Sequence, residues 1–101
     1  KFKEHLSISN INIANNNQEL EIIVQNNTNK EIKDIKINIS HLRDFFEKKI
    51  MIQEIDKWFP HEKLLFIFPI IPHINEYHIV INNTNEKLLS KKIDLNKLKK
   101  R

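Results

Sequence analysis

The sequence predicts an all-β domain in which seven short strands form an antiparallel sandwich or barrel, and three observations lead to this prediction. Apolar and polar residues alternate with a period of two over most of the chain. Turn-forming segments separate the alternating runs at roughly regular spacing. A parallel sheet would need helical crossovers of about ten or more residues between its strands. Only one short segment departs from the strand period, so an antiparallel arrangement is predicted. The predicted strands span residues 6–13, 19–25, 34–40, 50–55, 63–70, 76–82 and 88–95.

The first two strands are predicted from an interrupted and a regular alternation. In residues 6–13, Ile8 lies on one parity and Ile11 on the other, which predicts a bulge or bend near Asn10. Residues 15–18, NNNQ, form a turn. Residues 19–25 then alternate regularly and predict a half-buried strand.

A polar segment rich in asparagine, QNNTNK at residues 25–30, separates the second and third strands. The chain contains no glycine, so asparagine is the simplest replacement for glycine in the turn that reverses the chain here. We expect Ile32 to lie under the sheet where the strand resumes, and Lys30 and Glu31 to face solvent. Residues 34–40 then show the clearest alternation in the chain.

The segment after the third strand predicts one short helical turn near residues 41–47. Ser40 has the side chain of a helix N-cap. Leu42, Phe45 and Phe46 fall near one face of a helix.

The last four strands follow in order. Residues 50–55 return to the strand pattern and lead into a loop at 56–62. Residues 63–70, KLLFIFPI, are apolar on both parities, which predicts a central strand covered on both faces. The remaining strands, 76–82 and 88–95, flank a turn.

Three motifs occur in an order that resembles a known group of domains. They are VQNNTNKEIKDIKI at residues 24–37, FPHE at 59–62 before the strand KLLFIFP, and PHINEY at 72–77. This order resembles immunoglobulin-like modules of the fibronectin type III kind, in particular the cell-adhesion-related repeats of prokaryotic surface proteins. The resemblance covers about residues 18–95 and implies a seven-stranded antiparallel immunoglobulin-like sandwich.

Two positions depart from the pattern of those modules. His61 and Asn75 stand where the modules usually have glycine. Asparagine tolerates the left-handed backbone region better than other residues do, so we expect Asn75 to adopt it. The resemblance also places Tyr77 where a corner tyrosine bonds the nearby backbone through its hydroxyl.

The size and charge of the chain predict one domain with a basic tail. A chain of 101 residues is sufficient for one core, which we assign to residues 1–95, with residues 96–101 as the tail. Residues 87–101 hold seven Lys/Arg and one Asp, a net charge of +6. We expect the tail to be solvated, with contact to an anionic surface as the alternative. Because the sequence starts at Lys1 without a signal peptide or membrane-spanning run, we expect a piece of a longer protein.

The composition argues against catalysis, cofactors and nucleic-acid binding. A chain without glycine has no phosphate-binding loop or nucleophile elbow, and a chain without cysteine has no thiolate metal site. The five histidines form no close pair, so no metal site is expected. The basic residues cluster at the C-terminal end and not on the body, which is unlike a nucleic-acid groove. We therefore expect a protein that is not an enzyme, has no cofactor and binds no nucleic acid.

The loop at residues 56–62 is the predicted contact site. Trp58, Phe59 and His61 are its candidate binding residues, because large aromatic side chains outside the alternation form contact patches. The alternative is that the aromatic residues cap the open end of the sandwich.

Three Asn-x-Ser/Thr sequences begin at Asn26, Asn38 and Asn82. Asn26 and Asn82 lie in predicted turns, so they are the candidate glycosylation sites if the protein leaves the cytosol.

The sequence thus predicts a non-catalytic interaction or spacer module of a larger protein, with another protein or a neighbouring domain as its partner. The resemblance implies a location outside the cell or in the cell envelope. The first alternative is a cytoplasmic accessory sandwich that docks on a partner protein or an enzyme domain. The second is a carbohydrate-binding sandwich that stacks sugars on Trp58, Phe59 and Tyr77.

Overall fold

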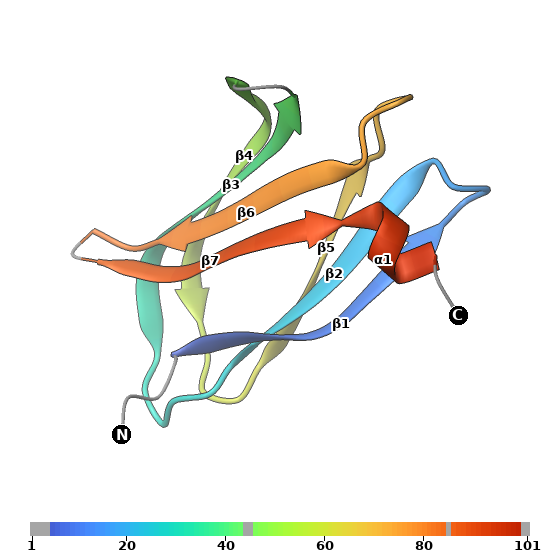
Figure 1. Ribbon diagram of the computed structural model, residues 1–101. Coiled ribbons are helices and arrows are strands. Elements are labelled where there is room, and N and C mark those ends of the chain that lie inside the picture. Colours follow the sequence, from blue (N-terminus) through green and yellow to red (C-terminus); the bar gives the residue numbers. More distant parts are fainter. Residues whose placement is uncertain (1–4, 44–45, 85, 100–101) are drawn as a thin grey trace.

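The computed structural model describes residues 5–43, 46–84 and 86–99 and contains seven strands and one short helix (Figure 1). The fold is an all-β sandwich, as the alternation predicts. In chain order the elements are β1 (Leu6–Ala14), β2 (Glu19–Asn26), β3 (Ile32–Arg43), β4 (Phe46–Trp58), β5 (Lys63–Pro69), β6 (Glu76–Asn82), β7 (Lys87–Asp94) and α1 (Leu95–Lys99).

The strands form two antiparallel sheets (Figure 1). The three-stranded sheet has the order β1-β2-β5, and the four-stranded sheet has the order β4-β3-β6-β7. In constant-type immunoglobulin domains the fourth strand belongs to the sheet of the first, second and fifth strands, whereas β4 here lies beside β3. The predicted bulge in the first strand is confirmed by a register shift between Ile8 and Asn10.

The core lies between the two sheets and consists of the inward parity of each strand. In β2, the buried side chains alternate strictly with half-buried ones, because successive side chains of a strand point to opposite faces. The same alternation places isoleucines of β3 and β6 opposite one another in register, as for Ile37 and Ile81. Among the described residues, the fully buried aliphatic side chains are Leu6, Leu20, Ile22, Val24, Ile35, Ile37, Ile39, Ile79, Ile81 and Leu95.

The predicted helical turn near residues 41–47 is wrong for the residues that the structure describes there. Residues 41–43 continue β3 and residues 46–47 begin β4, while Phe45 lies outside the described residues. Leu42 pairs with Glu47 and His41 with Lys48, so the two strands form a long hairpin. One helical turn gains little by itself, whereas extended backbone here continues a ladder of sheet hydrogen bonds.

The fifth strand was predicted to be central, and this is also wrong. Strand β5 is an edge of the three-stranded sheet and pairs with β2 alone. Phe66 and Phe68 point into the core, but Leu65 is 53% exposed and Ile67 is 44% exposed. The apolar run therefore buries one of its faces and leaves the other open.

The turns of this glycine-free chain use other residues in the left-handed region. Three consecutive asparagines, Asn15, Asn16 and Asn17, have φ of 56°, 56° and 65° and connect β1 to β2. His61 has φ of 64°, so it does occupy a glycine-like conformation. The expectation for Asn75 is wrong, because His73 (φ 69°) takes the left-handed conformation in that connection.

The corner tyrosine is confirmed. Tyr77 is completely buried, and its hydroxyl accepts a hydrogen bond from the Ile71 N–H at 2.9 Å and donates one to the Ile74 carbonyl at 3.0 Å. Burial raises the pKa of the Tyr77 hydroxyl above its usual value. The neutral phenol thus fixes the connection between β5 and β6 at one end of the sandwich.

The chain ends in a short helix after β7. Leu95 is buried, so the first residue of α1 anchors it to the sandwich. The predicted basic tail at 96–101 therefore begins in α1, while residues 100–101 lie outside the described part of the chain. No helix among the described residues has the length and apolar character needed to span a membrane.

Candidate functional site

Three loops come together at the end of the sandwich where β1 begins (Figure 1). They are the β2–β3 loop (27–31), the β4–β5 loop (59–62) and the described residues 83, 84 and 86 between β6 and β7, which we call the β6–β7 loop. We call this end the loop end. Loops at one end of a two-sheet sandwich are carried on rigid strands, so they can differ in sequence without disturbing the core.

The buried side chain of Asn26 organises the loop end. Its Nδ2 lies 2.9 Å from the Lys30 carbonyl, 3.2 Å from that of Trp58 and 3.1 Å from that of Phe59, so the amide group donates across two loops. Its Oδ1 accepts from the backbone N–H and the hydroxyl of Thr28 at 2.9 Å and 2.7 Å. The asparagine-rich segment is therefore the predicted turn, but a side chain and not a left-handed residue shapes it.

The burial expected for Ile32 and the exposure expected for Lys30 and Glu31 are confirmed. Ile32 is buried where β3 begins, and Lys30 and Glu31 are exposed.

Trp58 is buried in this structure. Its exposed fraction is 0%. Its indole N–H donates to the Glu62 carbonyl at 2.9 Å, and its ring packs edge-to-face on Phe66 with centroids 5.9 Å apart. A buried indole whose N–H has a partner closes the end of the core. The structure thus supports the capping alternative for Trp58.

The two other predicted contact residues lie at the surface. Phe59 is 53% exposed. His61 is exposed, its Nε2 lies 3.0 Å from Asn29 Oδ1, and its carbonyl accepts from Gln25 Nε2 at 3.2 Å. These bonds hold the β4–β5 loop against the β2–β3 loop and leave the Phe59 ring facing solvent.

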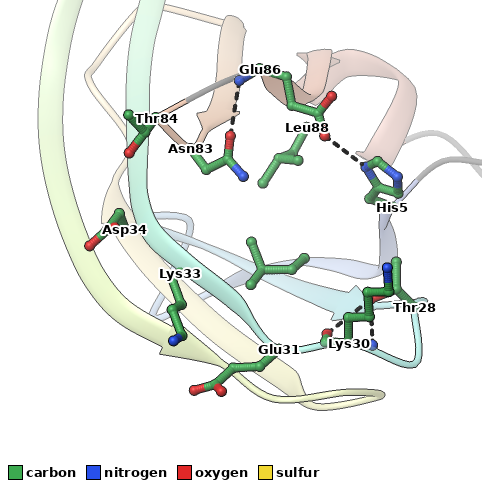
Figure 2. A pocket seen from close by; sticks show the side chains of 11 residues that line it. His5, Thr28, Lys30, Glu31, Lys33, Asp34, Asn83, Thr84, Glu86 and Leu88 are labelled. Carbon is green, nitrogen blue, oxygen red and sulfur yellow. Dashed lines mark hydrogen bonds and ion pairs between the residues drawn. The ribbon is translucent and has the colours of Figure 1, made fainter.

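A cavity of about 350 Å³ opens beside these loops, between the β2–β3 and β6–β7 loops and His5 (Figure 2). Its charged lining residues carry both signs. His5 Nδ1 lies 3.3 Å from the Glu86 carboxylate. Lys30 and Lys33 lie on the other wall. Ligand pockets are usually lined mainly by apolar side chains, so this mixed lining fits a polar contact surface better than a deep small-molecule site. Within residues 5–43, 46–84 and 86–99, no three His, Asp or Glu residues are grouped to hold a metal ion.

A second polar arrangement lies on the outer face of the four-stranded sheet. His78 Nδ1 is 3.2 Å from Glu47 Oε2, and His78 Nε2 is 2.8 Å from Ser90 Oγ. The Ser40 hydroxyl donates to the same Glu47 carboxylate oxygen. This hydrogen bond, followed by the contact with His78, lowers the pKa of Glu47. We call these four residues the polar chain; they join β3, β4, β6 and β7.

The order of groups in the polar chain is that of a nucleophile, a base and an orienting carboxylate. It lies on the open face of a sheet, however, and neither Glu47 nor His78 lines the cavity at the loop end. No sequence pattern indicates the polar chain, because its members come from four strands and only the strand register brings them together.

The outer face of the three-stranded sheet is apolar at its centre. Ile23 and Leu65 are direct register partners, and Ile67 lies diagonally across from Ile23, opposite Glu21. Leu65 and Ile67 are exposed, and Ile23 is half-buried. We call Ile23, Leu65 and Ile67 the apolar face. The apolar run of β5 made Leu65 and Ile67 recognisable as apolar positions. The prediction of a central strand covered on both faces implied that they are buried, whereas they are exposed.

The two candidate glycosylation sites differ in the exposure of their side chains. Asn26 is 0% exposed and its side-chain amide is fully used, so the folded chain has no room for a glycan on its Nδ2. Asn82 is half-buried at the last position of β6.

Comparison with known proteins gives no family assignment. No protein-family model matches the chain, and no curated protein matches it. Among solved structures it is similar to part of the β-glucosidase 3B of Thermotoga neapolitana in complex with glucose, with 12% identity, a TM-score of 0.48, and coverage of 91% of this chain and 16% of that one.

Two other glucosidase structures are similar to the same extent. The GH3 β-glucosidase of Bifidobacterium adolescentis has 8% identity and a TM-score of 0.46, with 92% of this chain and 17% of that chain covered. The β-glucosidase of Kluyveromyces marxianus in complex with glucose has 13% identity and a TM-score of 0.47, with 91% and 14% covered. This chain therefore spans a small fraction of each enzyme, and at these scores the likeness carries no argument about activity.

Proposed function

We propose that this chain is a non-catalytic interaction or spacer module of the fibronectin type III-like kind within a larger protein, and that it contacts a neighbouring domain or protein through the apolar face. The observation that carries the proposal is the exposure of Leu65 (53%) and Ile67 (44%) beside Ile23 on adjacent strands. The order of the sequence motifs supports the choice of domain type.

The apolar face differs from ordinary surface apolar residues in being contiguous. Isolated exposed leucines are common, whereas adjacent ones on a regular surface mark contact sites. A strand surface is also rigid, so little conformational entropy is lost when a partner covers it. Phe59, 53% exposed at the β4–β5 loop that precedes β5, is a second contact position in this proposal.

Site-specific photo-crosslinking in the producing organism tests the proposal. The photoreactive residue p-benzoylphenylalanine replaces Leu65 in one variant and Glu54 in another. Glu54 is the matched control because it is exposed on β4, in the other sheet, and pairs only with the surface residue Lys36. We expect one defined crosslinked product, a neighbouring domain or a separate protein, from position 65 and none from position 54.

A further substitution tests whether the apolar character matters. Ile67→Asp places a carboxylate on the apolar face without touching the core, so the crosslink from position 65 should be lost while the circular dichroism spectrum stays unchanged. Ile67→Val should preserve the crosslink. Equal crosslinking from positions 65 and 54, or a crosslink that survives Ile67→Asp, would rule out the apolar face as the contact surface.

We also propose a location outside the cell or in the cell envelope, which rests on the resemblance to surface-protein repeats. Protease treatment of intact cells distinguishes this from the cytoplasmic alternative. An epitope-tagged chain at the surface is degraded by added protease, whereas a cytoplasmic accessory sandwich survives until the cells are lysed.

Two of the three aromatic side chains that the carbohydrate-binding alternative requires for stacking on a sugar are buried. Trp58 and Tyr77 are both 0% exposed, so neither ring is available for stacking on a sugar. Phe59 alone remains at the surface.

A further inference from the structure

Strand β7 forms a regular free edge of the four-stranded sheet. It pairs with β6 alone, and the register is unbroken from Glu76 opposite Asp94 to Ile81 opposite Leu89. A free edge presents unpaired backbone groups that another strand can bind. In β1, an edge of the other sheet, a register shift next to Ser9 interrupts the edge. Strand β7 is therefore the better template of the two.

The hydrogen-bond pattern shows which residues of β7 face this free edge. The Leu95 N–H donates to the Asn75 carbonyl at 2.8 Å, so this pair occupies a hydrogen-bonded position that continues the β6–β7 register by one residue. Hydrogen-bonded and non-hydrogen-bonded pairs alternate along antiparallel strands. Ser90 and Lys92, opposite Val80 and His78, therefore belong to non-hydrogen-bonded pairs. Their backbone N–H and C=O groups point away from β6.

Lys91 has an unusual position on this strand. It shares the parity of Leu89 and Ile93, which are buried in the core, yet its side chain is exposed. Within the described part of the chain Lys91 has neither an ion pair nor a side-chain hydrogen bond. An inward-pointing charge on an edge strand prevents pairing with a second copy of the same edge, because two such charges would meet. It leaves the edge open to a strand of opposite charge.

A groove runs along this edge. It has a volume of about 620 Å³ and lies between β1 and β7, with α1 at one end. Ile8 and Ile11 of β1 and Leu98 of α1 give it apolar walls, and Ser90 and Lys91 line it from β7. Leu98 is 37% exposed, so it is accessible to a partner side chain.

We propose that the free edge of β7 binds an acidic extended segment of a partner protein as an added strand, by β-augmentation. The segment pairs its backbone with the outward N–H and C=O groups of Ser90 and Lys92. A carboxylate of the segment lies opposite Lys91, and apolar side chains two residues before and after it, on the same face of the added strand, enter the groove toward Ile11 and Leu98. The net charge of +6 over residues 87–101 attracts such a segment over a distance. This surface is separate from the apolar face, so the proposal does not depend on the proposed function.

Two labelled peptides test the proposal with the full chain. One is the nonapeptide TTITETITT, whose glutamate and isoleucines lie on one face of an extended strand, and the other carries lysine in place of the glutamate. Fluorescence anisotropy should show binding of the acidic peptide only, weakened by added salt. Hydrogen exchange followed by nuclear magnetic resonance should show new protection of the Ser90 and Lys92 amides on binding. Equal binding of both peptides, or protection at another strand, contradicts the proposal.

Substitutions separate the charge from the backbone contribution. Lys91→Glu should weaken acidic-peptide binding by about tenfold or more, the effect of losing a hydrogen bond to a charged group. Lys57→Glu, the same charge change at an exposed position of β4, is its control. Ser90→Pro removes one outward N–H, which edge strands tolerate, and should abolish the protection, whereas Ser90→Ala keeps the N–H and should bind. Unchanged binding by Lys91→Glu and Ser90→Pro overturns the proposal.

Other occupants of the edge give distinct results. A second copy of this chain would show as a dimer in analytical ultracentrifugation, with protection of the same amides in the absence of peptide. An anionic membrane would show as binding to phosphatidylserine vesicles without binding of the acidic peptide. Either result excludes an acidic partner strand.

Discussion

The side-chain Nδ2 of Asn26 donates a hydrogen bond to the backbone carbonyl of Trp58 over 3.2 Å, inside the protein. This contact joins the end of β2, in the three-stranded sheet, to the end of β4, in the four-stranded sheet. One amide thereby fixes the distance between the two sheets at the loop end. The consequences can be measured.

Asn26→Ala should destabilise the fold strongly. The change leaves the buried carbonyl of Trp58 and the N–H of Thr28 without their partner, which costs about 2–4 kcal/mol of the free energy of unfolding. Asn26→Asp should also destabilise, because a carboxylate cannot donate to the carbonyl oxygens. Urea unfolding measures both, with Asn12→Ala at an exposed position of β1 as the control. A loss for Asn26→Ala no larger than that for Asn12→Ala contradicts the assigned role.

The folded protein should carry no glycan on Asn26. Its Nδ2, the atom to which a glycan attaches, is engaged with the carbonyls of Lys30, Trp58 and Phe59. When the chain is secreted from a eukaryotic host, peptide mass spectrometry of the folded fraction should find Asn26 unmodified. A glycan at Asn26 on correctly folded protein would disprove the burial of this side chain.

The single tryptophan should report a dry environment. Trp58 is fully buried and its indole N–H is bonded to the Glu62 carbonyl. Its fluorescence should therefore be blue-shifted in the native state and resist quenching by acrylamide, and unfolding in urea should remove both properties. Free tryptophan in the same buffer is the reference. If acrylamide quenched the native protein as efficiently as the reference, Trp58 would be exposed to solvent and would again be a candidate contact residue.

Tyr77→Phe should loosen the connection between β5 and β6. The ring and its edge-to-face packing on Phe68 remain, but the hydrogen bonds to Ile71 and Ile74 are lost. We expect a loss of about 1–2 kcal/mol in the free energy of unfolding. Because the folded pKa of Tyr77 is raised above 10, its contribution is complete below pH 10 and is lost as pH rises toward the folded pKa. Phe68→Leu, which keeps the hydroxyl bonds, should leave this alkaline dependence in place.

Glu47→Gln should remove an acid-dependent part of the stability. The folded pKa of Glu47 lies below its usual value of 4.5, so the unfolded chain binds more protons in acid. Its contribution is present above about pH 4.5 and is lost as pH falls through the lowered folded pKa. The change is small because the carboxylate faces solvent. Urea midpoints measured from pH 7 to about pH 3 should fall less for Glu47→Gln than for the parent chain; parallel curves would contradict the assignment.

The alternation of side chains was sufficient to predict the number of strands and most of the core. The pattern around Leu20, Ile22 and Val24 assigns one face of β2 to the interior, because a strand turns every second side chain the same way. The corner position of Tyr77 followed from the resemblance to fibronectin type III-like modules. Both features depend on the order of residues along the chain.

The errors for β5 and for residues 41–47 share a physical cause, which is that they depend on what surrounds a strand. An apolar run such as β5 has the same sequence whether it is central or at an edge and whether one or both of its faces are covered; here its outer face is open, which leaves Leu65 exposed. The spacing of Leu42 from the two phenylalanines fits a helical turn. Leu42 nevertheless lies in a strand, because it pairs with Glu47 across the β3–β4 hairpin.

At the candidate site, too, some features follow from the sequence and others only from the tertiary structure. The sequence by itself determined that Trp58 and Phe59 follow the alternating run of residues 50–55 and that asparagine forms the turn after β2. Only the tertiary structure decided that Trp58, the last residue of β4, is buried while Phe59 is exposed. The Asn26 side chain binds the backbone carbonyl of Trp58, and the Glu62 carbonyl binds its indole N–H. Burial at the end of a strand depends on such contacts between distant segments, and no periodicity in the sequence records them.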